Sequence, residues 1–341
     1  MMSDVEIRIL KKDEYGKWDG FVNKSHHGTI FHNSDWLGTC SEVLNKDFKI
    51  HGFFDEEELI GGCAFFIERV KGLLIGSSFC EMTPYFGLIW EGATETKLRK
   101  EEMLFREFMN SFQKQVEQQL DRTYIINPPG FMDVRPFAQN GYRTEIKYTY
   151  YLKTKNITKS KGTQKIINGA RKKGIYIEKS DEIQEYSKLL EKTLLRKRIQ
   201  FPRSKDLMLR LYNKFHDKKQ AELWIARTKD GEVAAGEIIL NDPKMVNRWS
   251  AATNIELGNT GANALLLDTA FLEYDMKGYE TINLMCANVP SLTQFVSGFN
   301  PILVPYFSLE RNNKKYEIAK QSSDIFKKTT NGIKGIFMNF C

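Results

Sequence analysis

The chain of 341 residues carries 50 Lys and Arg against 43 Asp and Glu, which gives a formal net charge of +7. Its 41% hydrophobic and 27% charged residues are ordinary for a soluble globular protein and argue against long disordered tails. The length predicts two domains of about 150 residues each. The excess of positive charge favours anionic partners, but it is smaller than in a dedicated nucleic-acid-binding protein.

The cysteines are odd in number and widely spaced, and none forms a C-x-x-C motif. Neither a disulfide framework nor a zinc site is indicated, and we expect reduced thiols. The start, "MMSDVEIRIL", does not have the basic and then apolar pattern of a signal peptide. The most apolar run, residues 59–67, is about half the length that spans a bilayer. These features predict a cytoplasmic protein without a membrane span.

The N-terminal half predicts alternating helices and strands. Ser34 is placed to N-cap a helix with apolar residues at helical spacing. Strands are expected at 48–54 and 59–68, on either side of an acidic turn. A long amphipathic helix over 96–121 then leads into a strand at 122–127.

The C-terminal half repeats this order. Strands are expected at 232–240 and 246–253, followed by a helix over 262–277 and a strand at 280–286. Both halves then continue with an Asn- and Pro-containing loop and a short helix. In each half a glycine follows this helix and signals its end. Duplication of one α/β unit explains the repeat, although strand-helix-strand patterns also recur in unrelated α/β proteins. We expect two domains, 1–152 and 153–300, with 301–341 as a candidate completion of the first.

Residues 153–179 form a stretch rich in Lys and Arg between the two halves. Such a run is most often a solvated linker and helix face, but it also fits an anionic or RNA partner. The helix that follows carries Arg196, Lys197 and Arg198 at its C-terminal end, where positive charge complements the helix dipole.

Five stretches together resemble the FemAB-like and BioF2-like members of the GNAT superfamily of N-acyltransferases. The resemblance extends from about Phe31 to Glu310 and implies a mixed α/β fold of two tandem GNAT-like domains, each a central sheet flanked by helices. It also implies transfer of an acyl or aminoacyl group from an activated donor to an amine. Some relatives use acyl-CoA, and others use aminoacyl-tRNA to build peptidoglycan cross-bridges. The stretches are "FHNSDWL" (31–37), "TPYFG" (83–87), "ARKKGI" (170–175), "VAAGEIIL" (233–240) and "SLTQFVSGFNPILVPYFSLE" (291–310).

The sequence departs from the cross-bridge enzymes at two places. Their lysine after the early tryptophan has no counterpart near Thr39 and Cys40, and their late Phe-Lys pair reads Phe295-Val296 here. The resemblance therefore favours an acyl-CoA-dependent N-acyltransferase that acts on a small-molecule amine or an amino-sugar, in cell-surface polysaccharide or cell-wall synthesis. An aminoacyl-tRNA-dependent peptidyltransferase and a non-enzymatic RNA-binding protein are the alternatives.

Acyl transfer to an amine requires a base, because an alkylammonium is almost wholly protonated at pH 7. Glu237, in "VAAGEIIL", is the candidate, since burial would raise its basicity. Strand alternation also allows Glu237 to face solvent. Asn254 and Asn288 lie near strand ends and are candidate donors to the oxyanion, although either can instead make a turn.

A phosphate-bearing donor is expected at "GNTGANALLL", where glycines allow close backbone approach and a helix N-terminus attracts anions. This segment lacks the R/Q-x-x-G-x-G/A signature of ordinary acetyl-CoA-binding GNATs, and it also fits a simple capped helix start. Guanidinium groups suit diphosphates. The candidate donor-binding residues are Gly258, Thr260, Gly261, Ala262, Arg171 and Arg248.

Aromatic faces suit sugar rings and acyl chains, so several aromatic residues are candidates for an acceptor cleft between the domains. The candidate acceptor-binding residues are Tyr85, Trp90, Arg196, Arg198, Trp249 and Tyr306. The same aromatic residues also fit a core. His26, His27 and His32 lack a fourth ligand nearby, and no H-E-x-x-H motif is present, so no metal is expected. Hydrolase, NTPase and dehydrogenase motifs are also absent from the sequence.

Overall fold

The computed structural model describes residues 5–91, 98–196, 202–285 and 287–322. Its described residues divide into two compact units: unit 1 contains those of 5–147 and 305–322, and unit 2 contains those of 148–304. The predicted domain boundary after residue 152 and the unit boundary after residue 147 both fall within one strand, β7 (Arg143–Lys153).

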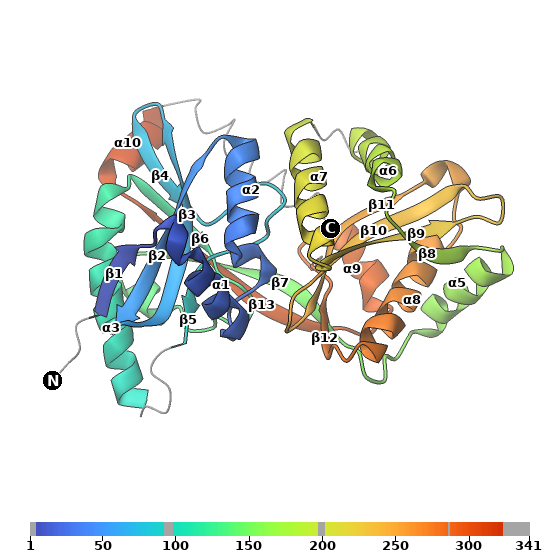
Figure 1. Ribbon diagram of the computed structural model, residues 1–341, viewed down its shortest axis with the longest axis horizontal. Coiled ribbons are helices and arrows are strands. Elements are labelled where there is room, and N and C mark those ends of the chain that lie inside the picture. Colours follow the sequence, from blue (N-terminus) through green and yellow to red (C-terminus); the bar gives the residue numbers. More distant parts are fainter. Residues whose placement is uncertain (1–4, 92–97, 197–201, 286, 323–341) are drawn as a thin grey trace. The chain divides into compact units, whose positions relative to one another are not determined.

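Unit 1 is built on a mixed sheet with the strand order β1-β2-β3-β4-β6-β13 (Figure 1). Neighbouring strands are antiparallel except β4 and β6, which run parallel, and β5 adds to β3. The strands are β1 (Val5–Ile9), β2 (Asp47–Asp55), β3 (Glu58–Val70), β4 (Leu73–Ser77), β5 (Ile89–Trp90), β6 (Arg122–Ile126) and β13 (Ile302–Asn312), which enters unit 1 at Pro305. The helices are α1 (Tyr15–Lys24), α2 (Ser34–Leu44), α3 (Leu98–Gln115), α4 (Arg135–Gln139) and α10 (Lys314–Ser322).

The core of unit 1 confirms the predicted amphipathic helix. The apolar face of α3 packs on the sheet, with the rings of Phe108 and Phe53 4.4 Å apart and those of Phe112 and Phe65 6.1 Å apart. The helix is shorter than expected. Its last residues leave the α-helix and form the 3-10 turn η3 (Glu117–Gln119), where the Glu117 carboxylate pairs with Arg311 of β13.

Unit 2 has the strand order β7-β12-β11-β10-β9-β8, with β11 and β12 parallel and the other neighbours antiparallel. The strands are β7 from Tyr148 on, β8 (Tyr176–Ser180), β9 (Ala221–Arg227), β10 (Val233–Asn241), β11 (Val246–Thr253) and β12 (Thr281–Asn283). The helices are α5 (Lys161–Lys172), α6 (Ile183–Arg196), α7 (Pro202–Asp217), α8 (Ala262–Met276) and α9 (Pro290–Ser297).

Helices cover both faces of the sheet in unit 2 (Figure 1). α8 packs on β9 and β10 on one face, beside α5, and is buried on nearly every side. α6 packs on β10 and β11, and α7 packs on β9, on the other face. Each unit is therefore a mixed sheet flanked by helices, as the sequence predicts.

One local prediction is wrong. The strand expected at 280–286 ends at Asn283, because its side-chain Oδ1 accepts the Met285 N–H at 3.1 Å and turns the chain, with Met285 at φ 56°. The helix stop expected at Gly298 is confirmed, because α9 ends at Ser297 and Gly298 is its C-cap. Gly298 keeps a helical φ of −63°, and the left-handed residue that follows is Asn300, with φ 55°.

Candidate active site

The polar centre of unit 2 lies where β11 and β12 separate. The two parallel strands pair only through Val246 with Ile282 and Asn247 with Asn283. β12 ends at Asn283, whereas β11 continues to Thr253. In the described part of the chain, β11 therefore has no strand partner on this side beyond Asn247. We call this place the β11–β12 fork.

The free edge of β11 presents backbone N–H groups. The Asn254 N–H donates to the Ala234 carbonyl on the β10 side at 2.9 Å. Because N–H directions alternate along a strand, the N–H groups of Ala251 and Thr253 are directed away from β10. A fixed N–H at such an edge is a suitable donor to a carbonyl oxygen that gains negative charge during acyl transfer.

A β-bulge lies beside the fork. Ile238 pairs with Ser250, but the next residue of β10, Ile239, pairs with Arg248, which leaves Trp249 as the extra residue of β11. Bulges bend a strand and change its twist, and they are frequent next to active sites. This bulge falls between the last register shared with β12 and the free edge.

Buried polar side chains meet at the fork. The Thr149 hydroxyl donates to Asn283 Oδ1 at 2.6 Å, and Asn283 Nδ2 donates to Asn247 Oδ1 at 3.2 Å. The Asn247 side chain is fully buried, and its Nδ2 has no hydrogen-bond partner among the described residues. An unmade buried hydrogen bond costs about 1–3 kcal/mol. The fork therefore holds a buried donor whose hydrogen bond is unmade within the described chain.

The sequence interpretation did not select Asn247 or Asn283. A signal was present, because each asparagine interrupts an apolar strand, in "VNRWS" and "TINLM". Asparagine is depleted in strands, so one in the middle of a buried strand suggests a specific hydrogen-bonding role. The sequence could not show that the two residues lie opposite each other.

Glu237 is buried, so the solvent-facing alternative is wrong. It is 4% exposed, and its carboxylate forms a bidentate ion pair with Arg248, in which Nη2 lies 2.9 Å from Oε2 and Nε bonds to Oε1. Glu237 pairs in register with Ala251, on the strand that carries the free edge. Both carboxylate oxygens of Glu237 already accept hydrogen bonds from Arg248. The role of Glu237 as a base stays a prediction, and it requires this ion pair to open.

Asn254 and Asn288 have structural hydrogen bonds. Asn254 Oδ1 accepts the Glu256 N–H at 3.1 Å, and its Nδ2 donates to the Val233 carbonyl at 3.2 Å. Asn288 Oδ1 accepts the Tyr148 N–H at 2.9 Å. These bonds match the turn alternative for Asn254. The oxyanion role of both residues stays a prediction.

The predicted donor segment forms the start of α8. Gly258 and Gly261 have φ of 67° and 77°, and Thr260 Oγ1 accepts the Ala262 N–H at 3.2 Å. A Cβ added at Gly261 would lie 2.9 Å from the Ile166 carbonyl oxygen of α5, so only glycine allows this close approach. The structure thus brings the four candidate residues of this segment together in one capped turn.

The candidate arginines are separated. Arg171 donates to Asp268 of α8 at 3.2 Å with half of its side chain exposed, and Lys159 pairs with the same carboxylate. Arg248 is held by Glu237. Arg196 is the last residue of α6, and Arg198 lies outside the described residues.

The candidate aromatic residues are buried in the two units. Tyr85 packs against Tyr306 with ring centroids 5.8 Å apart, and Trp90 packs against Phe108 at 5.3 Å, all within unit 1. Trp249 is the buried bulge residue of unit 2. These positions match the core alternative, and the acceptor-binding role of the four side chains stays a prediction.

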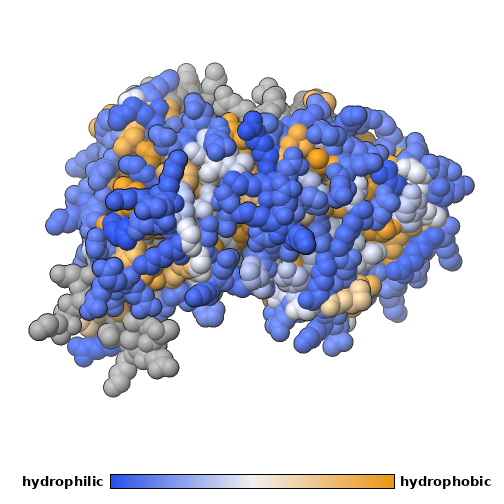
Figure 2. Space-filling view, viewed as in Figure 1, coloured by the Kyte–Doolittle hydropathy of each residue, from blue (hydrophilic) through white to orange (hydrophobic). Residues whose placement is uncertain are grey.

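A basic hollow lies along α5. Its volume is about 760 Å³, and four lysines line it together with Ile157, Gly169 and two amide residues. Figure 2 is mostly hydrophilic over the part of unit 2 where Figure 1 places α5. The lysines are Lys159, Lys161, Lys165 and Lys172. Such a surface attracts anions through its combined field.

Three further observations concern the cysteines, possible metal ligands and possible membrane-spanning helices of the described residues. Cys40, Cys63 and Cys80 are free and buried. No group of three or more His, Cys, Asp or Glu side chains in the described part of the chain could hold a metal ion. No helix among those residues has both the length and the apolar character needed to cross a membrane.

Comparison with known families identifies the second unit. Residues 168–290 match the model of an acetyltransferase (GNAT) domain. The match contains the β11–β12 fork, Glu237 and the α8 turn. The chain therefore contains an acetyltransferase domain of the GNAT type, over residues 168–290. No curated protein sequence matches this chain.

Solved structures extend the similarity of fold to the whole chain. A structure of FemX aligns with a TM-score of 0.68 at 11% identity, covering 91% of this chain and 98% of that chain. A tandem GNAT protein from the clavulanic acid biosynthesis pathway aligns with a TM-score of 0.52 at 11% identity, covering 90% and 98%. L-PGS from Bacillus licheniformis aligns with a TM-score of 0.56 at 11% identity, covering 98% of each chain. The predicted tandem GNAT fold of FemAB type is confirmed.

Proposed function

We propose that this GNAT acyltransferase transfers an acyl group from an activated donor to an amine at the β11–β12 fork. One observation carries the proposal: Asn247 has a fully buried Nδ2 without a partner in the described chain, at the point where β12 leaves β11. A carbonyl oxygen of the donor would accept the missing hydrogen bond of Nδ2. This hydrogen bond would become stronger in the transition state, when the oxygen carries negative charge.

The reaction forms a C–N bond and breaks the bond between the acyl carbon and its carrier. The amine nitrogen attacks the donor carbonyl, and the oxygen takes up negative charge between Asn247 Nδ2 and the β11 edge. The departing carrier takes the electron pair of the broken bond, and the nitrogen loses a proton. Glu237, on the neighbouring strand, is the proposed proton acceptor once its pair with Arg248 opens.

The leading donor is acyl-CoA. Its diphosphate suits a helix N-terminus, which α8 supplies where it begins at Ala262. Lys173 adds a cation beside the α8 turn, because its Nζ donates to the Asn259 carbonyl at 2.6 Å. The acceptor is proposed to be an amine of a small molecule or an amino-sugar, in cell-surface polysaccharide or cell-wall synthesis.

The lysine hollow along α5 favours a second candidate donor, aminoacyl-tRNA. Four lysines around one cavity suit a phosphate chain better than a single diphosphate. The non-enzymatic RNA-binding alternative is set aside, because the matched domain is an acetyltransferase domain.

A donor comparison separates these candidates. Acetyl-CoA, a longer acyl-CoA series, aminoacylated tRNA and uncharged tRNA are each added while the melting temperature is followed. A donor at 100 times its Kd adds about 2.7 kcal/mol to the free energy of unfolding. Lys165→Ala with Lys172→Ala should weaken tRNA binding and flatten its salt dependence, with little effect on acetyl-CoA. No stabilisation by either donor class would contradict the proposal.

The role of Asn247 has its own test. With the donor found above, Asn247→Ala should lower kcat about 10²- to 10³-fold while KM changes little, because the bond strengthens mainly in the transition state. Asn110→Ala, at an exposed position on α3 of unit 1, is the matched control and should keep full activity. Equal kcat for the two variants would remove Asn247 from the mechanism.

A further inference from the structure

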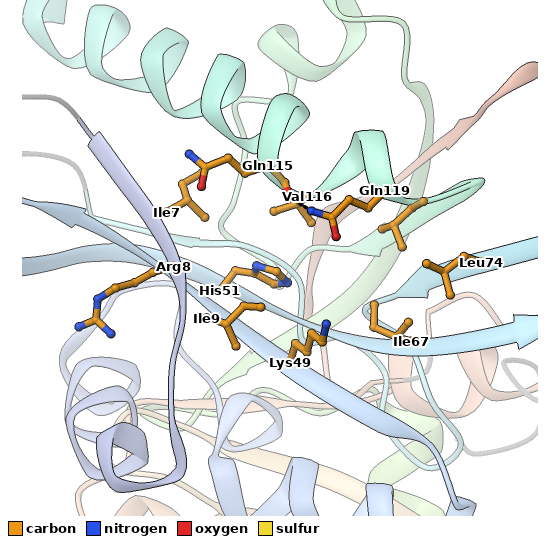
Figure 3. A pocket seen from close by; sticks show the side chains of 11 residues that line it. Ile7, Arg8, Ile9, Lys49, His51, Ile67, Leu74, Gln115, Val116 and Gln119 are labelled. Carbon is orange, nitrogen blue, oxygen red and sulfur yellow. Dashed lines mark hydrogen bonds between the residues drawn. The ribbon is translucent and has the colours of Figure 1, made fainter.

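A second cavity lies in unit 1, and none of its lining residues belongs to the fork. It has a volume of about 370 Å³ and opens between the end of α3 and the face of the sheet (Figure 3). β1, β2, β3, β4, α3 and η3 all contribute to its lining. Six aliphatic residues form most of the walls: Ile7, Ile9, Ile67, Leu74, Val116 and Leu120. A volume in this range suits a small organic ligand.

His51 is the buried polar residue of this cavity. It is 7% exposed, and in Figure 3 its imidazole lies among the lining side chains, below α3. Among the described residues neither ring nitrogen has a hydrogen-bond partner, and the contact of the ring is with Phe65, at a centroid distance of 6.0 Å. Burial lowers the pKa of His51 from 6.5 to about 4, so the ring is neutral near pH 7. Within the described chain, this ring therefore has neither an acceptor for its N–H nor a donor to its bare nitrogen.

The charges of the lining are positive. Lys49 lies two residues before His51 on β2, and its ammonium has no ion-pair partner among the described residues. Arg8 of β1 is already occupied, because it pairs with Glu14 at 2.6 Å and lies 4.2 Å over the ring of Phe54. β3, β4, α3 and η3 contribute apolar or amide side chains, and no carboxylate lines the cavity. The site therefore favours an anion and disfavours a cation.

We propose that this cavity binds a small carboxylic acid with an aliphatic chain. The chain lies along the isoleucine and leucine walls, and the carboxylate lies beside Lys49, where it accepts the N–H of His51. The lining is divided in the same way. Aliphatic residues form most of the walls, whereas Lys49 and His51 are neighbours on one face of β2. The ligand would supply the acceptor that His51 lacks and would join the end of α3 to the edge of the sheet.

Octanoate is the probe for a titration of the whole chain followed by histidine NMR. A bound carboxylate favours the imidazolium, so the pKa of His51 should rise from about 4 by at least one unit. Octylammonium, with the same chain and the opposite charge, should leave the titration unchanged. No change in the His51 titration with octanoate up to solubility, or the same change with octylammonium, would overturn the proposal.

Variants test the same site by octanoate binding. Lys49→Met, at an exposed position, should fold normally and should weaken octanoate at least fivefold. Lys24→Met, at an exposed position at the end of α1, is the matched control and should bind as the parent does. Equal affinities of Lys49→Met and Lys24→Met would show that octanoate binds elsewhere or without specificity. This test is independent of acyl transfer, so either proposal can fail alone.

Discussion

Asn247 and Asn283 face each other at the last register that joins β11 to β12, with Asn283 Nδ2 donating to Asn247 Oδ1 at 3.2 Å. Beyond this pair the strands separate and one edge of β11 becomes available. The pair therefore marks the inner end of the proposed donor site, and its hydrogen bonds hold two strands that share only two registers.

Asn283 should be important for stability as well as for the site. Asn283→Leu removes the partners of Thr149, Asn247 and the Met285 N–H together. Each buried group left without a bond costs about 1–3 kcal/mol, so we expect a loss of more than about 2 kcal/mol in the free energy of unfolding measured with urea. The exposed Asn110→Leu should change it by less than about 0.5 kcal/mol. Similar values for the two variants would contradict the role given to Asn283.

The buried pair of Glu237 and Arg248 should be costly to break from one side. Arg248→Met leaves the Glu237 carboxylate buried and unpaired, which should cost about 3–5 kcal/mol of stability. The double variant Glu237→Leu with Arg248→Met removes both charges and should recover most of this loss. Urea unfolding of both proteins measures the difference. A double variant as unstable as the single one would show that packing, not charge, dominates there.

Gly236 should tolerate no side chain. A Cβ at this position of β10 would lie 2.7 Å from Cδ2 of Tyr186, which is fully buried and donates its hydroxyl to Ser250 Oγ at 2.7 Å. Gly236→Ala should therefore destabilise the protein by about 1–3 kcal/mol through overpacking. Gly38→Ala, inside α2 with open space around the new Cβ, should stabilise it by about 0.5–1 kcal/mol. Thermal unfolding of the two variants should show shifts of opposite sign.

Glu117 should make unit 1 less stable as pH rises. Burial raises the pKa of this carboxyl from 4.5 to about 7, and this outweighs the opposing effect of its partner Arg311. The folded state then keeps a proton that the unfolded state has lost between these two values. The corresponding stability is fully present below pH 4.5 and is lost as pH rises through about 7.

Glu117→Gln removes this dependence on pH. The free energy of unfolding of the variant, relative to the parent, should rise by an amount on the order of 3 kcal/mol between the two pKa values. His51 has the opposite dependence, because its pKa is lowered from 6.5 to about 4, but it is present in both proteins and cancels in the difference. Urea unfolding from pH 4 to pH 8 gives the comparison, and a difference that is constant with pH would contradict the raised pKa.

Local patterns predicted most of the fold. The spacing of Leu104, Phe108 and Phe112 predicted the face that α3 packs on the sheet, because helical periodicity depends only on neighbours along the chain. The similar order of elements in the two halves predicted two sheets flanked by helices. Element ends were less well predicted, as at Asn283, where one side-chain hydrogen bond turns the chain earlier than the apolar pattern implies.

The candidate site depended on the tertiary structure. The sequence by itself determined the α/β class, the two similar units and the residue types available for acyl transfer, since these follow from periodicity and composition. Only the tertiary structure decided that Glu237 is buried against Arg248, and that Asn247 meets Asn283 and keeps an unpaired Nδ2. The partners in both pairs are brought together by strand register, and register is set by the packing of the whole sheet rather than by any short stretch of sequence.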